Sequence, residues 1–127
     1  GLSIAGLSLS PNGSTLAIRL RHYSRASLQS GVQDAIRLMP ASDLMQQLEV
    51  DRGAAGSGLS WSPDGRWLAF DLKGDIGVVS PAGTSMRYVT NSGAAGAPLW
   101  ISDDEIWFTA IHGGTFTNQR VIFPQPG

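Results

Sequence analysis

Short runs of aromatic and aliphatic residues alternate with polar turn sequences along the whole chain. Near its middle, one run ends at Trp61 and the next begins after Arg66, with Ser62-Pro-Asp-Gly65 between them. Proline presets φ and Asp-Gly tolerates positive φ, so this tetrapeptide predicts a tight turn. The two flanking runs are therefore predicted to pair as a β-hairpin.

Two further strands are predicted after this hairpin. Lys73-Gly-Asp75 is a second turn sequence, and an apolar run follows it over residues 76–79. Pro81-Ala-Gly-Thr84 is a third turn, and residues 86–90 then alternate in character as strand residues do. Four short antiparallel strands joined by tight turns form one blade of a β-propeller.

The pattern of this hairpin occurs three times. Leu7-Ser-Leu-Ser-Pro-Asn-Gly-Ser-Thr-Leu-Ala-Ile18 returns as Leu59-Ser-Trp-Ser-Pro-Asp-Gly-Arg-Trp-Leu-Ala-Phe70, and in eroded form as Leu99-Trp-Ile-Ser-Asp-Asp-Glu-Ile-Trp-Phe108. A repeat of roughly 40 residues is typical of propellers and other modular folds. The sequence therefore predicts an all-β fold, a single partial propeller domain over 1–127, with blades at about 4–50, 57–90 and 97–124.

The first and third copies differ from the second in length. The first turn lies 52 residues before the second, but aligning Asp34 with Asp75 and Met45 with Met86 gives 41, which leaves an insertion of 11 residues within 21–33. In the third copy, strands are predicted at 99–100, 105–110 and 120–123, and the fourth strand is missing. Closed propellers have about four to eight blades. With fewer than three complete blades, this one is expected to be open or to be completed by association.

The repeat resembles a known family. Trp61-Ser-Pro-Asp-Gly-Arg-Trp-Leu-Ala-Phe70, followed by Gly74-Asp-Ile76 and Met86-Arg-Tyr-Val-Thr90, is similar to the WD40-like repeat called PD40. That repeat builds TolB-like propellers and the non-catalytic propellers of prolyl-oligopeptidase-type and tricorn-type proteases. The resemblance implies a propeller fold and, through TolB, an extracytoplasmic and periplasmic location with partners at the cell envelope.

Composition and motifs exclude several other classes of function. The net charge of −1 gives no sign of nucleic-acid binding, and the absence of Cys excludes disulfides and thiolate metal sites. No apolar run approaches the roughly 20 residues of a membrane-spanning helix. The chain has no Gly-x-Ser-x-Gly, no phosphate-binding glycine loop and no His-Glu-x-x-His. We therefore expect neither an enzyme nor a cofactor.

Two regions are predicted to bind partners. Basic residues gather where the insertion begins, and a protruding basic loop with one aromatic suits an acidic partner, a lipid headgroup or a phosphate. The second region is the pair of terminal strands, near Ile4 and around residues 121–123, whose exposed β edges can pair with a partner or with another copy. The candidate partner-binding residues are Arg21, His22, Tyr23, Arg25, Val121 and Phe123.

Other polar and aromatic residues have simpler explanations. His22 and His112 lie 90 residues apart, as do Leu16 and Ile106, but without a carboxylate at fixed spacing they fall short of a metal site. The turn aspartates are expected to cap the backbone rather than to catalyse. The four tryptophans are expected to pack between blades, with Trp67 the best candidate for exposure.

The sequence leaves three functions open. The first is a non-catalytic scaffold or protein-interaction module, part of a larger assembly at the cell envelope. The second is an accessory propeller piece of a prolyl-oligopeptidase-like (S9-type) peptidase. The third is small-ligand or glycan binding through an exposed tryptophan.

Overall fold

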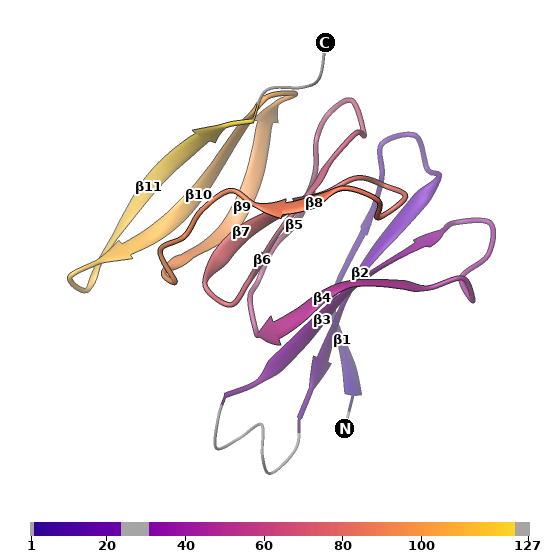
Figure 1. Ribbon diagram of the computed structural model, residues 1–127, viewed down its shortest axis with the longest axis horizontal. Helices are drawn as coiled ribbons and strands as arrows, with labels where there is room; N and C mark the ends of the chain where they lie inside the picture. Colours follow the sequence, from indigo (N-terminus) through magenta and orange to yellow (C-terminus); the bar gives the residue numbers. More distant parts are fainter. Residues whose placement is uncertain (1, 24–30, 124–127) are drawn as a thin grey trace.

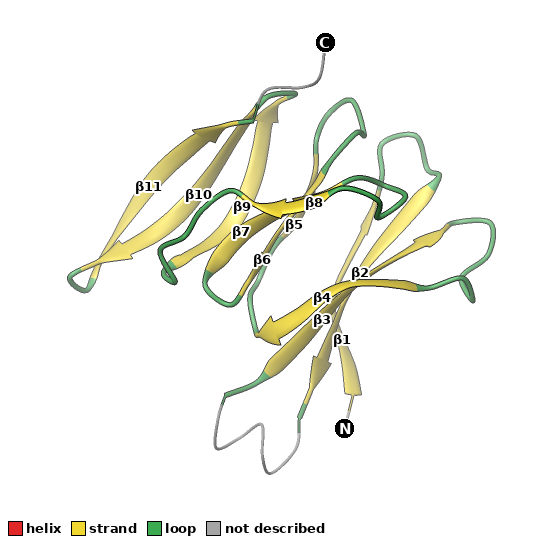
Figure 2. Ribbon diagram, in the orientation of Figure 1, coloured by secondary structure: helices red, strands yellow, loops and turns green. Residues whose placement is uncertain are grey.

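The computed structural model describes residues 2–23 and 31–123 of the 127-residue chain. These residues form eleven β-strands in three antiparallel sheets, and among them no helix is long and apolar enough to cross a membrane. Figure 1 shows the second sheet between the first and the third, and Figure 2 shows turns and loops connecting the strands within the described residues.

The first two sheets each contain four strands, and the third contains three among the described residues. The strands of the first sheet are β1 (Leu2–Leu9), β2 (Thr15–His22), β3 (Gln33–Pro40) and β4 (Leu48–Ala54). Those of the second are β5 (Leu59–Trp61), β6 (Leu68–Leu72), β7 (Asp75–Val79) and β8 (Met86–Tyr88). Those of the third are β9 (Ala95–Ser102), β10 (Glu105–His112) and β11 (Thr115–Ile122). Within each sheet, strands that are consecutive in sequence pair with one another.

Two strands extend beyond their predicted ends. The insertion was predicted to begin at Arg21, but β2 continues to His22 and pairs with β3, which begins at Gln33. In the third sheet, the strand predicted from residue 120 begins at Thr115. Gly113 and Gly114 have φ of 56° and 80°. Positive φ at both positions suits the tight type I′ turn, which brings β11 back along the whole of β10.

The alignment of the first two copies is wrong by one residue after the insertion. Leu16 lies opposite Met39, and its counterpart Leu68 lies opposite Val79, so the third strands are 40 residues apart rather than 41. Asp34 therefore does not correspond to Asp75, because a slip of one residue moves a side chain to the other face of its sheet. Met45, which was aligned with Met86, lies before β4 and is 88% exposed.

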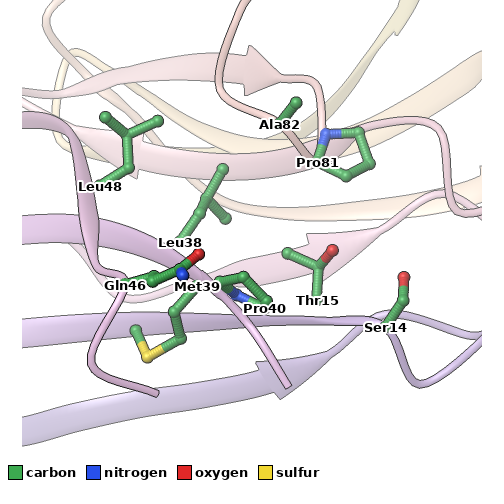
Figure 3. Close-up of a pocket in the computed structure, with 9 residues that line it drawn as sticks. All are labelled: Ser14, Thr15, Leu38, Met39, Pro40, Gln46, Leu48, Pro81 and Ala82. Atoms are coloured by element: carbon green, nitrogen blue, oxygen red, sulfur yellow. The ribbon is translucent and has the colours of Figure 1, made fainter. Parts of the chain in front are cut away.

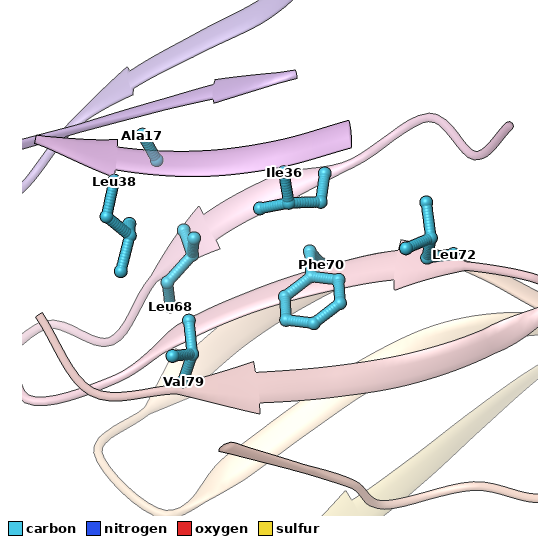
Figure 4. Close-up of a cluster of buried hydrophobic side chains, with 7 residues drawn as sticks. All are labelled: Ala17, Ile36, Leu38, Leu68, Phe70, Leu72 and Val79. Atoms are coloured by element: carbon cyan, nitrogen blue, oxygen red, sulfur yellow. The ribbon is translucent and has the colours of Figure 1, made fainter. Parts of the chain in front are cut away.

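The three sheets pack face to face through alternate residues of their strands. Figure 4 shows the interface of the first and second sheets, made by Ala17, Ile36 and Leu38 against Leu68, Phe70, Leu72 and Val79. A second cluster joins Ala69 and Val78 of the second sheet to Trp100, Ile106 and Phe123 at the third. Burial of these side chains is the main force that holds the stack together.

A buried ionic network joins the first two sheets where the chain crosses between them. The fully buried Arg19 on β2 bonds Asp34 at 2.7 Å and the Oδ1 atom of Asp71 at 3.1 Å. Arg19 also donates to the carbonyl of Gly58. The backbone N–H of Gly58 in turn donates to Asp71. The connection from β4 to β5 is thereby fixed from both sides.

Candidate interaction surface

The strand β11 forms an open edge of the third sheet. It pairs with β10 on one side, and no described strand pairs with it on the other. Phe123 donates its N–H to the carbonyl of Asp104, so its backbone faces β10. Because successive residues of an antiparallel strand direct their N–H and C=O groups to opposite sides, the backbones of Thr117, Gln119 and Val121 also face β10. The open edge therefore presents the N–H and C=O groups of Phe116, Asn118, Arg120 and Ile122.

The side chains predicted to bind at this edge turn inward instead. Phe123 is only 4% exposed and packs edge-on against Trp67, with ring centroids 4.9 Å apart. The guanidinium of Arg87 lies 4.6 Å from the centre of the Phe123 ring. Val121 is half-buried and packs against the same cluster. These two side chains join the second and third sheets, so a partner at this edge meets its backbone and the side chains of other β11 residues.

The first residues of the predicted basic loop belong to a strand in the structure. Arg21 lies within β2, and its guanidinium donates to Asp34 at 2.8 Å and to the carbonyl of Gly56 at 2.7 Å. The hydrogen bond to Asp34 raises the pKa of Arg21, and the residue forms part of the ionic network. His22 lies at the end of β2, Tyr23 just beyond it is 43% exposed, and Arg25 lies outside the described residues.

The two histidines have different surroundings. His22 lines a hollow of about 290 Å³ with Gln33, Asp34, Ala35 and Arg52. His112 lies on the third sheet, with its Nε2 atom 2.9 Å from the amide nitrogen of Gln119. Among the described residues, no group of three or more His, Cys, Asp or Glu side chains could hold a metal ion.

Most turn carboxylates and amides bond their own turns, as the sequence predicts, whereas Asp103 accepts the backbone N–H of Asp64 in the neighbouring sheet. Asp64 accepts hydrogen bonds from the Ser62 hydroxyl and the Arg66 N–H, and Asn12 accepts from the hydroxyls of Ser10 and Ser14. Such bonds stabilise a turn locally. No catalytic role is needed to explain these residues.

The most exposed tryptophan is Trp107 rather than Trp67. Trp67 packs against Phe123, Trp100 is buried, and the indole N–H of Trp61 donates to the carbonyl of Ser8. Trp107 is 44% exposed on the face of the third sheet that points away from the second. Its exposure was missed because, within an alternating strand, the sequence does not say which face will be covered.

A hollow of about 420 Å³ lies at one rim of the junction between the first two sheets. Figure 3 shows Leu38, Met39 and Pro40 of β3 on one side and Pro81 and Ala82, from the turn after β7, on the other. Its remaining lining is Ser14, Thr15, Gln46 and Leu48. None of these side chains titrates in the physiological range. The lining offers apolar contact and a few neutral hydrogen-bonding groups, and no acid or base.

The stack also exposes an apolar face at each end. The first-sheet outer face carries exposed Leu2, Ile4, Leu7 and Leu9 of β1, beside half-buried Leu16, Ile18 and Leu20 of β2. The third-sheet outer face carries exposed Leu99, Ile101, Trp107, Ile111, Phe116 and Ile122. Scattered exposed apolar residues are normal, but contiguous patches of this kind mark sites of interaction.

Comparison with known proteins identifies the architecture. The sequence matches no established family profile and no curated protein. Among solved structures, an acylaminoacyl peptidase of Pyrococcus horikoshii matches 87% of this chain at 17% identity and a TM-score of 0.65. The propeller domain of the trilobed protease of Pyrococcus furiosus matches 85% at 14% identity and 0.59. A TolB-type protein of Agrobacterium tumefaciens matches 96% at 19% identity and 0.62.

The chain is a partial β-propeller. The match covers 17% of the P. horikoshii chain, 33% of the P. furiosus domain and 46% of the A. tumefaciens chain. At such low identities the likeness establishes the fold alone. It confirms the predicted blades of antiparallel strands, an architecture that TolB-like and peptidase propellers share.

Proposed function

We propose that this partial propeller is a non-catalytic protein-interaction module that accepts a strand from its partner at the open edge of β11. The observation that carries this proposal is a difference among the three sheets. In the first two sheets the third strand pairs with a fourth antiparallel strand, whereas in the described part of the third sheet it does not. Backbone groups at such an edge bind an added strand with little dependence on its sequence.

The side chains beside the edge supply selectivity. Phe116, Asn118, Arg120 and Ile122 point to the third-sheet outer face, since side chains alternate along a strand. Thr117 and Gln119 point to the opposite face. A strand added to β11 therefore meets aromatic, amide, cationic and aliphatic groups in turn on one face, and two neutral polar groups on the other.

A location at the cell envelope is part of the proposal. The likeness to a TolB-type protein supports it, together with the resemblance of the repeat to the PD40 family. Tyr23 and Arg25 stay candidates for a second contact with that partner. Fractionation of cells that express the tagged protein, followed by immunoblotting, tests the location.

Strand addition is tested with a peptide that copies β4, the fourth strand of the first sheet (Leu48–Ala54). We expect the peptide to slow amide hydrogen exchange at Phe116, Asn118, Arg120 and Ile122. Asn118→Pro removes one outward N–H without touching the bonds to β10, and should weaken peptide binding by about tenfold or more. Asn118→Ala removes the same side chain but keeps the N–H, so it is the matched control and should bind more tightly than the proline variant. Equal binding by the proline variant would overturn the proposal.

The second candidate function is an accessory propeller of a peptidase. It is favoured by the likeness to the P. horikoshii peptidase and the P. furiosus protease, of which this chain spans only a part. The sequence that follows Gly127 in the genome separates the two candidates. An α/β-hydrolase domain with Gly-x-Ser-x-Gly there would favour the peptidase.

A further inference from the structure

The two outer faces of the stack are opposite halves of one repeated interface. Leu68, Phe70 and Leu72 of β6 pack the second sheet onto the first. Ile106, Phe108 and Ala110 of β10 likewise point from the third sheet toward the second. Aligning the equivalent turns before β2 and β6 shows that Leu16, Ile18 and Leu20 hold the same positions in β2. These three side chains lie on the first-sheet outer face. That face therefore has the residues with which a sheet packs onto the sheet before it.

The other end of the stack carries the complementary half. Ala17 of β2 packs the first sheet onto the second, and Ala69 of β6 packs the second onto the third. In β10 the residues on the corresponding side are Trp107, Thr109 and Ile111, which lie on the third-sheet outer face. This face therefore lies on the side that contacts the next sheet in the first and second sheets, with Trp107 where they have alanine.

We propose that the third-sheet outer face of one copy of this chain packs against the first-sheet outer face of a second copy, head to tail. The inference deepens the proposed function and rests on it, since it describes how the interaction module completes itself. Because the two faces differ, the contact is heterologous, and such contacts either close into a ring or continue. Two copies bring together six sheets, twice the three of one chain, and propellers have about four to eight blades.

The exposed apolar area is large enough for such a contact. The six apolar side chains of the third-sheet outer face are between 44% and 72% exposed. Since an aromatic side chain covers ~150–250 Å² when buried, Trp107 and Phe116 alone expose roughly 200 Å², and the four aliphatic side chains add to this area. The largest patch on a typical monomer is about 300–600 Å². A standard interface buries about 800 Å² of each partner. The polar side chains of Thr109, Asn118 and Arg120 on the same face add to the area that can be buried.

Charges on the two faces do not oppose the contact. On the third sheet, Arg120 pairs with Glu105 at 2.8 Å. On the first sheet, Glu49 pairs with Arg52 at 2.7 Å, and Arg37 lies 3.8 Å from the same carboxylate. Cations are thus paired within each face. Among the described residues of these faces, the contact therefore buries charge pairs rather than lone charges, whose burial would be costly.

The open edge of β11 remains free in this arrangement. Face-to-face packing uses side chains, whereas strand addition uses the N–H and C=O groups at the edge of the sheet. The head-to-tail contact and the strand-accepting edge can therefore be tested separately.

Light scattering of the purified 127-residue chain tests the arrangement. We expect a mass of twice 13.4 kDa at micromolar concentration. Trp107→Glu on one face and Leu7→Lys on the other should each weaken dimerisation by at least tenfold. An equimolar mixture of the two variants should restore dimers, because one interface in each mixed dimer is then unaltered. Met45→Glu, in the exposed turn between β3 and β4 and outside the residues that form either face, is the matched control and should leave the dimer intact.

Several outcomes would overturn the inference. A wild-type monomer, or a dimer unaffected by either variant, would show that the faces are not covered by a second copy. A dimer lost with Trp107→Glu but kept with Leu7→Lys would indicate a symmetric contact between third sheets. Should a charged variant fail to fold by circular dichroism, Trp107→Thr and Leu7→Thr replace it. Peptide binding at β11 without dimers would overturn this inference and leave the proposed function standing.

Discussion

The carboxylates of this protein act chiefly as structural acceptors. Asp34 is shared by Arg19 and Arg21, and it also accepts the backbone N–H of Gly56. Burial works to raise the pKa of Asp34, but the hydrogen bonds from Arg21, Arg19 and Gly56 outweigh it and lower the pKa. Asp75 shows the same balance, with its pKa lowered by Thr90, Ser92 and Gly93. Each carboxylate therefore holds in place a segment that connects one sheet to the next: Asp34 the segment from β4 to β5, and Asp75 the segment from β8 to β9.

At the residue scale, these lowered pKa values predict loss of stability in acid. A carboxyl group whose pKa is lower in the folded state stabilises that state above its unfolded pKa of about 3.9, and the contribution is lost as the pH falls toward the folded pKa. The free energy of unfolding in urea should stay nearly constant between about pH 7 and 5 and decline below about pH 4.

The variant Asp34→Asn provides the comparison for the acid prediction. It leaves Arg19 and Arg21 without their shared carboxylate, so it should lower the free energy of unfolding by about 3–5 kcal/mol at neutral pH. Its decline in acid should be shallower than that of the parent. Greater stability at pH 3 than at pH 7, in either protein, would contradict the assignment.

At the scale of the element, β11 shows how an edge strand differs on its two sides. Its eight residues pair along the full length of β10, yet half of its backbone groups face the open edge. The side chains at the end of the strand do not mark this edge, because Val121 and the following Phe123 turn toward the second sheet. The strand is therefore held by its side chains and leaves its backbone accessible.

Proline substitution should distinguish the two sides of β11. Asn118→Pro removes an N–H that faces the open edge, so the free energy of unfolding should change by less than about 1 kcal/mol. Gln119→Pro removes an N–H that bonds β10 and should cost about 3 kcal/mol. Thermal and urea unfolding of both variants measure the difference. Equal losses would show that the assignment of inward and outward amides is wrong.

At the scale of the whole molecule, the order of the sheets depends on a few inter-sheet anchors. The second and third sheets meet at Phe123, whose ring centroid lies 4.9 Å from that of Trp67 and 6.0 Å from that of Trp100. The first and second sheets have both an apolar cluster and the ionic network of Arg19. The second and third sheets also meet through Ile76, Ala95, Phe108 and Ala110. Phe123 is thus an anchor of the third sheet and has no part in attaching the first.

Phe123→Ala should therefore loosen the third sheet selectively. Truncation of a buried phenylalanine costs about 3–5 kcal/mol. Amide hydrogen exchange in β9–β11 should accelerate more than exchange in β1–β4, measured by mass spectrometry under native conditions. Phe116→Ala, an exposed phenylalanine on β11, is the matched control. Uniform acceleration over all three sheets would mean that the stack unfolds as one unit.

The sequence by itself determined the elements that depend on neighbouring residues. The Pro-Asn-Gly and Pro-Asp-Gly turns, the hairpins that they close and the recurrence of the blade could all be predicted, because turn geometry is set within a few residues. The candidate site was predicted only in outline. The open edge in the third blade was expected from the missing fourth strand, but the residues assigned to it were not the ones that remain accessible.

Only the tertiary structure decided which groups are left for a partner. The register across the insertion, the inward turn of Phe123, the capture of Arg21 by Asp34 and the exposure of Trp107 all depend on contacts between distant segments. A strand pattern with period two fixes two faces but not which of them another sheet will cover, and an arginine at the end of a strand gives no sign of a carboxylate brought to it by folding. The packing of the sheets makes that choice.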